Sequence, residues 1–155
     1  MNLTNEEVLE LIPQQEPFRF IDKIHHIDDT TIKASFTFRP DMDFYRGHFP
    51  ENPVTPGVIL IEAAAQMSAV SHGIWLLAKE CERKEQINEY TTLFTGLENT
   101  EFLKSVLPGD TVFVEGKLLT WKRKRIKHDV IMRNHNNDII MTCIFSGFGV
   151  KFKNG

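Results

Sequence analysis

The feature that most constrains the fold is an almost uninterrupted apolar stretch from Val58 to about Lys79. Apolar residues occupy nearly every helical face of this stretch, a pattern expected for a helix that other parts of the chain enclose. Its length would suffice to cross a membrane, but Glu62, Gln66, Ser68, Ser71 and His72 interrupt it. A charge at the middle of a bilayer costs about 2.5–3.5 kcal/mol. We therefore predict the buried central helix of a soluble protein, without a membrane span.

Much of the remaining chain shows the alternating apolar pattern of β-strands, as in residues 32–38. The predicted strands are 18–27, 32–38, 91–97, 101–106, 110–121, 125–133 and 138–153, with turns at 108–109 and 134–138. One enclosed helix and several mostly antiparallel strands indicate the α+β class. The chain has the length of one ordinary domain, so residues 1–155 are predicted to fold as a single domain.

Two other segments have clear local signals. Thr4 and Glu7 have the spacing of a capping box, which predicts a short helix that ends before Pro13. Residues 40–56 hold four of the seven prolines and are predicted to form a loop, because proline lacks the amide that regular hydrogen bonding needs. This loop leads directly into the central helix.

Composition excludes several function classes. The net charge of −3 argues against a general nucleic-acid binder, which would need a basic surface. Cys81 and Cys143 form no C-x-x-C pattern, and the amino terminus has no signal-like sequence. A cytoplasmic, reducing compartment is therefore expected.

Candidate chemical groups gather where the loop enters the helix. The first amides of a helix have no partner inside it, so the start at Gly57 favours an electron-rich oxygen. Glu62 and Gln66 share one helical face, and burial would raise the pKa of the Glu62 carboxyl toward that of a useful proton donor. His48, in the loop, is a candidate base.

Simpler interpretations of the same residues stay open at this level. Glu62 could satisfy a buried arginine or a backbone amide, and a histidine in a loop is usually solvated. Gly57 could serve only a tight turn, and the apolar helix could be core alone. Composition and spacing thus predict a site here without naming its reaction.

Four segments in a fixed order carry a resemblance to a known family. They are PFRFIDKI at 17–24, GHFP at 47–50, P-x-x-PGVILIEAAAQ at 53–66 and TGLENTEFLKSVLPGD at 95–110. Together they resemble the β-hydroxyacyl-acyl carrier protein dehydratases of the hot-dog family, most closely the FabZ type, which use a glutamate where FabA-type relatives have an aspartate. The resemblance implies a hot-dog fold, in which a curved antiparallel sheet wraps around a long helix. It also implies a homodimer whose two sheets continue into one; a trimer of dimers is common among FabZ-type relatives.

The resemblance also assigns roles to residues. His48 would remove the C2 proton of a 3-hydroxyacyl chain carried by acyl carrier protein. Glu62 of the other subunit would protonate or orient the departing 3-hydroxyl, which leaves a trans-2-enoyl product. The amides of Gly57 and Val58 would bind the thioester oxygen, and Gln66 would hold Glu62. No metal and no organic cofactor is required, because the thioester itself acidifies C2.

The sequence departs from the family pattern at two positions beside the candidate site, and two other functions stay open. Glu51 stands where a small residue is usual after GHFP, and Thr55 replaces a common Met before Pro-Gly. The basic run 121–127 is a candidate docking patch for the acidic carrier protein, or else a solvated strand face. A hot-dog thioesterase and a noncatalytic acyl-binding subunit are the alternative functions.

Overall fold

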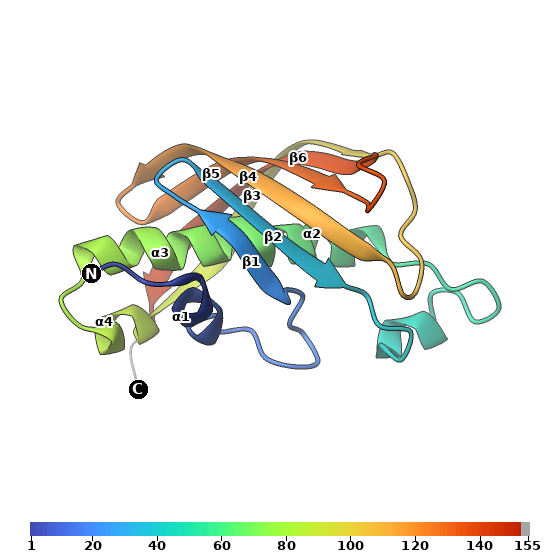
Figure 1. Cartoon of the computed structure of the whole chain (residues 1–155), viewed down its shortest axis with the longest axis horizontal. Coiled ribbons are helices and arrows are strands. Elements are labelled where there is room, and N and C mark those ends of the chain that lie inside the picture. The colour runs from blue at the N-terminus through green and yellow to red at the C-terminus, as the bar shows by residue number, and fades with distance from the viewer. Residues whose placement is uncertain (153–155) are drawn as a thin grey trace.

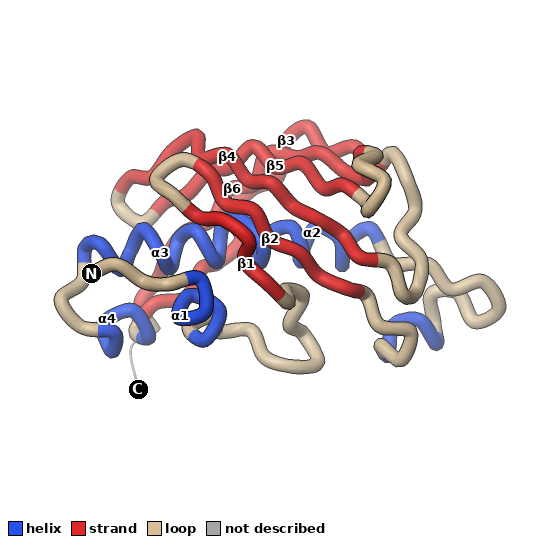
Figure 2. Tube along the Cα trace, in the orientation of Figure 1, coloured by secondary structure: helices blue, strands red, loops and turns tan. Residues whose placement is uncertain are grey.

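The computed structural model describes residues 1–152, which form a curved antiparallel sheet around one long helix (Figures 1 and 2). The six strands lie in the order β1-β2-β4-β5-β6-β3. This is the hot-dog architecture that the resemblance implies. The elements, in chain order, are α1 (Asn5–Glu10), β1 (Lys23–Ile27), β2 (Thr31–Thr37), the 3-10 turn η1 (Asp43–Arg46), α2 (Gly57–Ala65), the π-helical turn η2 (Gln66–Val70), α3 (Ser71–Glu80), α4 (Lys84–Asn88), β3 (Tyr90–Phe102), β4 (Thr111–Lys122), β5 (Arg125–Arg133) and β6 (Ile139–Lys151).

The central helix runs without interruption through α2, η2 and α3. Residues Gly57–Glu80 are long and apolar enough to cross a membrane by length and composition, yet 72% of their most apolar window is buried by the rest of the chain. The sheet packs closely against the helix at Gly116 of β4, where an added Cβ would lie 2.8 Å from the Ser68 Cβ. The predicted enclosed helix is therefore confirmed, and it is the sheet that encloses it.

The predicted strand 18–27 is wrong in its first half, since β1 begins only at Lys23. The Phe18 carbonyl and the Phe20 amide are hydrogen-bonded to the side chain of Gln66 in the central helix. These backbone groups therefore pair with a helix side chain in place of a neighbouring strand. The alternating apolar residues there reflect burial of one face of the segment. A segment outside a sheet can also bury one face, so the pattern alone does not prove a strand.

The two predicted strands 91–97 and 101–106 are one strand, β3, which ends at Phe102. Its pairing with β6 shifts register at two places, and Asn99 at the second shift has a positive φ of 50°. After Phe102 the amides of Leu103 and Lys104 converge on the Ile140 carbonyl. The interruption predicted near 98–100 is thus an irregularity within a continuous strand.

Two other local predictions are confirmed, and one helix was not predicted. The capping box of α1 is confirmed, since Thr4 Oγ1 accepts from the Glu7 amide and Glu7 accepts from the Thr4 amide. The hairpin turn at 134–138 is confirmed, with Asn137 at φ 66°. The sequence analysis missed α4, which interrupts the charged connector after residue 80. The last residue of the predicted strand 138–153 lies outside the described residues.

The two edges of the sheet differ in length. β1 has five residues, whereas β3 has thirteen and pairs only with β6. Leu93, Phe94 and Phe102 of β3 are each close to half exposed. A long edge strand with exposed apolar side chains is a favourable template for pairing with another strand.

Candidate active site

The backbone around His48 holds its imidazole in one orientation. η1 ends just before it, and the His48 amide donates to the Phe44 carbonyl at 3.0 Å. The Val54 amide donates to the His48 carbonyl at 3.0 Å, and His48 Nδ1 lies 2.9 Å from the Val54 carbonyl oxygen. Because a carbonyl only accepts, Nδ1 carries a proton, and in the neutral ring the lone pair is on Nε2. The half-buried ring is therefore set up to accept a proton at Nε2.

The start of the central helix leaves amides unpaired, as the sequence predicts. The Ile59 and Leu60 amides turn back to the Pro56 carbonyl. The Gly57 and Val58 amides have no acceptor within residues 1–152. Both contribute to the positive end of the helix dipole. Phe102 covers this end, since a Cβ added to Gly57 would lie 3.2 Å from the Phe102 Cζ.

Glu62 lies one turn inside the helix and is half-buried. Its Oε1 accepts a hydrogen bond of 2.8 Å from Gln66 Nε2. Burial raises the pKa of the Glu62 carboxyl above its usual value, and the Gln66 hydrogen bond offsets part of that rise. No arginine and no backbone amide is hydrogen-bonded to Glu62 within residues 1–152. The carboxyl is thus closer to a proton donor near neutrality than an exposed glutamate would be.

Gln66 is fully buried and uses both ends of its amide. Its Oε1 accepts from the Phe20 amide at 2.7 Å, while Nε2 donates to the Phe18 carbonyl at 2.9 Å as well as to Glu62. It also begins the π-helical turn, a departure from α-geometry that is frequent at functional sites. The side chain therefore joins the 18–20 segment, the helix and the candidate acid.

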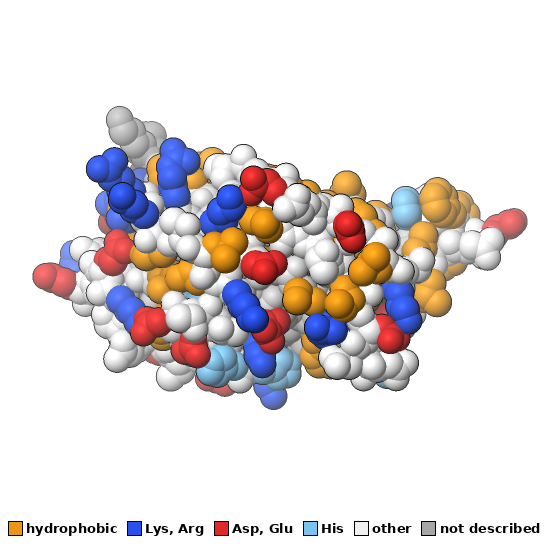
Figure 3. Space-filling view, turned by 90° about the horizontal axis from the view of Figure 1, so that it is seen from above, with side chains coloured by type: hydrophobic (Ala, Val, Ile, Leu, Met, Phe, Trp, Pro, Cys, Tyr) orange, Lys and Arg blue, Asp and Glu red, His pale blue; other side chains and the backbone are white. Residues whose placement is uncertain are grey.

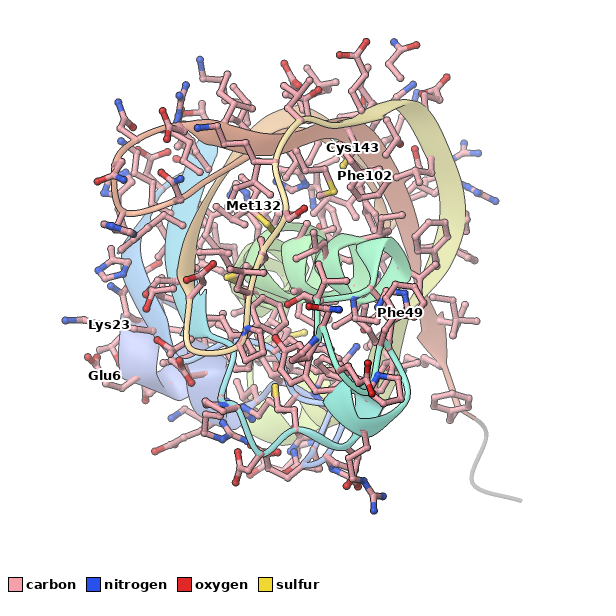
Figure 4. All side chains as sticks on the ribbon, turned by 90° about the vertical axis from the view of Figure 1, so that its right-hand side faces the viewer. Glu6, Lys23, Phe49, Phe102, Met132 and Cys143 are labelled. Carbon is pink, nitrogen blue, oxygen red and sulfur yellow. The ribbon has the colours of Figure 1, made fainter. Side chains whose placement is uncertain are left out.

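Within one chain the structure does not bring His48 and Glu62 together. No hydrogen bond joins them in the described range. A cavity of about 320 Å³ opens beside the helix start, and neither residue lines it. Figure 4 looks at this end of the molecule, where Phe49 follows His48 and Phe102 covers Gly57. The lining residues of the cavity are Val54, Thr55, Gly57, Leu60, Phe102, Leu103, Lys104 and Ser105.

Two contributors escaped the sequence analysis. Tyr45 and Thr55 are both buried, and their hydroxyl oxygens lie 2.6 Å apart. In the sequence, Thr55 stands out only as a departure from the family pattern, and nothing singles out Tyr45. No sequence signal pairs two hydroxyls ten residues apart across a loop. Residues 1–152 contain no group of three or more His, Cys, Asp or Glu side chains that could hold a metal ion.

The sequence is similar to that of known proteins over most of its length. The family model for the FabA-like domain matches residues 12–142. A 3-hydroxyacyl-[acyl-carrier-protein] dehydratase FabZ of Acetivibrio thermocellus is 38% identical over 124 residues, which cover 77% of this chain and 77% of that protein.

Solved structures support the fold. A dehydratase heterocomplex, ApeI:P, from Xenorhabdus doucetiae has a TM-score of 0.70 at 14% identity and covers 99% of this chain and 94% of that chain. A thioesterase from Haemophilus influenzae has a TM-score of 0.65 at 14% identity, with coverage of 97% and 93%. At such identity these two structures support the fold alone, whereas the family model and the FabZ relative show the family to which the chain belongs. The chain therefore belongs to the FabA-like family of hot-dog proteins, among its FabZ relatives.

Proposed function

We propose that this protein dehydrates 3-hydroxyacyl-acyl carrier protein to the trans-2-enoyl thioester in fatty acid biosynthesis. The FabZ relatives support the substrate class and the reaction type. The observation that carries the proposal is the hydrogen bond from His48 Nδ1 to the Val54 carbonyl, because it selects the neutral tautomer that has its lone pair on Nε2. The free thiols Cys81 and Cys143 support a cytoplasmic setting for this reaction.

His48 begins the elimination. Its Nε2 takes the proton from C2, and the electron pair of that C–H bond moves toward the thioester carbonyl as enolate charge develops. The Gly57 and Val58 amides stabilise this oxygen, because they are unpaired and lie at the positive end of the helix. Loss of one such donor typically costs about 2.7–4 kcal/mol of transition-state stabilisation.

Glu62 completes the elimination as the acid. The returning electron pair forms the C2–C3 double bond, and the C3–O bond breaks. The departing hydroxyl takes the proton of Glu62 and leaves as water. The cycle closes when the proton on His48 is lost to solvent and Glu62 is protonated again. Burial serves this role, since it favours the protonated carboxyl before the reaction.

The reaction needs two subunits in this proposal. The exposed edge strand β3 pairs with its copy about a two-fold axis, which joins two sheets into one. The axis reverses the long direction of the molecule, so the helix start of one subunit lies beside the central helix of the other. His48 of one subunit then faces Glu62 of the partner, and the acyl chain lies between them. A trimer of three such dimers is the further assembly that we expect.

In the two-fold dimer, the basic run 121–127 is also placed to help the acyl carrier protein dock. The β4–β5 turn lies where α3 ends, since Trp121 Nε1 donates to Glu80 Oε1 at 2.8 Å. Lysine and arginine side chains gather at one end of the sheet face in Figure 3. Lys122 and Arg123 are exposed and make no ion pair within residues 1–152. In the proposed dimer this turn lies near the partner's helix start, where it can attract an acidic carrier protein.

The test is a single assay with three distinguishable outcomes. The protein is incubated with 3-hydroxyacyl carrier proteins of several chain lengths, and the products are resolved by mass. Dehydration removes one water and leaves the thioester intact, as we expect. Release of the free acid would instead identify a thioesterase, and tight acyl binding without any product would identify a binding subunit. Either of these two outcomes would contradict the proposal.

A further inference from the structure

We propose that the hydrogen bond between Tyr45 and Thr55 positions the base His48 relative to the amides at the helix start. It would make Tyr45 and Thr55 positioning residues, since neither is proposed to touch the reacting atoms. The inference rests on the proposed function for its catalytic consequence. Its structural part is that the Tyr45–Thr55 hydrogen bond, called the lock below, closes the base of the loop that carries His48. That part rests on geometry alone.

The lock is short, buried and exclusive. The Tyr45 hydroxyl and Thr55 Oγ1 are 2.6 Å apart, and the two residues are 5% and 4% exposed. Neither hydroxyl has a second hydrogen-bond partner in the described part of the chain. Burial raises the pKa of Tyr45, so its hydroxyl stays protonated at physiological pH. Loss of either hydroxyl would leave the other buried without a partner, which is more costly than loss of both.

The bond closes the base of the loop that carries His48. On one side, Tyr45 belongs to η1, and the next turn of backbone fixes His48 through the Phe44 carbonyl. On the other side, the Thr55 amide donates to the buried Val106 carbonyl at 2.8 Å, which attaches this end of the loop to the rest of the domain. The Tyr45 bond therefore connects the side that carries the base to the side that is anchored.

The lock lies beside both reactive groups. Tyr45 precedes His48 by three residues, and Thr55 precedes Gly57 by two. The two hydrogen bonds between His48 and Val54 lie inside the segment that the Tyr45–Thr55 bond closes. They therefore depend on that bond to keep the two sides of the loop together. If the base of the loop opens, the imidazole loses the carbonyl that fixes its tautomer, and it moves away from the Gly57 amide. A misplacement of about 1 Å can cost on the order of a hundredfold in rate.

The lock is polar on both sides, so removing one hydroxyl differs from removing both. Two apolar side chains of matching shape should be able to close the loop again, because then no buried hydroxyl lacks a partner.

The experiment is a double-mutant cycle in the full-length protein with Tyr45→Phe, Thr55→Val and the double variant. Each single variant should lower kcat about five- to tenfold, as expected for one buried hydrogen bond, with KM changed less than twofold. The double variant should be no slower than either single variant. Thr111→Val is the matched control, because it removes a hydroxyl from the 2.8 Å Thr37–Thr111 bond between β2 and β4. It should leave kcat within about twofold of the wild type, since the bond between Thr37 and Thr111 does not involve the His48 loop.

A readout besides activity separates this inference from the proposed function. The Nδ1–H proton of His48 and the Val54 amide are followed by NMR at a temperature at which all variants are folded. Both should exchange with solvent at least tenfold faster in the single variants and should recover in the double variant. Unchanged exchange in Tyr45→Phe, or rate losses that multiply in the double variant, would overturn the lock. A wild type that shows the exchange pattern but no dehydration would overturn the proposed function and leave the lock intact.

Discussion

Gln66 Nε2 donates a hydrogen bond of 2.8 Å to Glu62 Oε1 one helical turn earlier, and the same amide group binds the backbone of residues 18–20. One buried side chain thus fixes the candidate acid and a segment that lies outside the sheet. The geometry explains how a carboxyl is tolerated in an apolar helix. One of its oxygens has a neutral donor, and the raised pKa lets it hold a proton.

Replacement of Gln66 by methionine should both destabilise the fold and shift the pH profile. The Phe20 amide would lose its buried acceptor, which costs about 1–3 kcal/mol of unfolding free energy. The pKa of Glu62 would rise further, because the hydrogen bond that offsets its rise is gone. Activity should therefore extend to higher pH, as an acid remains protonated longer. Urea unfolding and the alkaline limb of kcat/KM against pH check the two effects; an unshifted limb would exclude Glu62 as the acid.

Single variants of the two candidate catalytic residues should complement each other. His48→Ala and Glu62→Ala should each lower turnover by about 10²–10⁴-fold, the usual contribution of a general acid or base. A mixture with free subunit exchange contains one half hybrid dimers, each with one intact site of two, so roughly a quarter of the wild-type rate should return. Absence of recovery, with exchange verified by mass spectrometry, would rule out a site shared between subunits.

Charge reversal at the β4–β5 turn should weaken carrier docking alone. Lys122→Glu together with Arg123→Glu should raise KM for a carrier-bound substrate about tenfold, with kcat little changed. A short thioester without carrier protein is the control substrate, and its KM should stay within about twofold, because rim charges act mainly on the charged partner. Equal effects on both substrates would mean that the turn acts on the site itself.

A buried histidine pair should make the fold sensitive to acid. His72 Nε2 donates to the Asp28 carbonyl at 2.7 Å, and its Nδ1 lies 2.8 Å from Nε2 of His128. The carbonyl forces His72 to accept at Nδ1, so His128 donates, and the buried Nδ1 of His128 has no partner in the described part of the chain. Burial lowers the pKa of both rings, that of His128 to about 3.

The sign of the pH effect follows from these lowered pKa values. The His128 ring stays neutral in the folded state, whereas in the unfolded chain it binds a proton below about pH 6.5, so stability falls as pH drops below that value; the lowered pKa of His72 acts in the same direction. For His128 the loss approaches about 1.4 kcal/mol per pH unit. His128→Leu should reduce this slope between pH 6.5 and 5. Urea unfolding at three pH values measures the slope, and an identical slope in the variant would contradict the role of the pair.

Gly116→Ala should test the close contact between sheet and helix. The new Cβ would lie 2.8 Å from the Ser68 Cβ and 3.2 Å from side-chain atoms of Ile32 and His128. Since Ser68 belongs to the buried helix, the sheet must shift, and we expect a loss of about 1–3 kcal/mol. Chemical denaturation measures it. Gly47→Ala is the control, because nothing lies within 4 Å of its added Cβ.

Predictions from the sequence succeeded where the signal is local or is carried by motif order. The enclosed helix and most strands were predicted because burial leaves a periodic pattern in the residues themselves. The order of the GHFP loop and the helix start led to the family, and the FabA-like match over residues 12–142 confirms it. The first half of the strand predicted at 18–27 failed because Gln66, more than forty positions later, takes the hydrogen bonds that a neighbouring strand would have taken.

The sequence by itself determined that an apolar helix is surrounded by strands, that a proline-rich loop delivers a histidine to its start, and which family shares this order. Tertiary structure alone decided which nitrogen of His48 carries the proton, which hydroxyl Tyr45 meets and how Gln66 holds Glu62. The physical reason is the range of the forces. Hydrophobic periodicity is written along neighbouring residues, whereas a hydrogen bond depends on two atoms whose meeting is arranged by the packing of the whole domain.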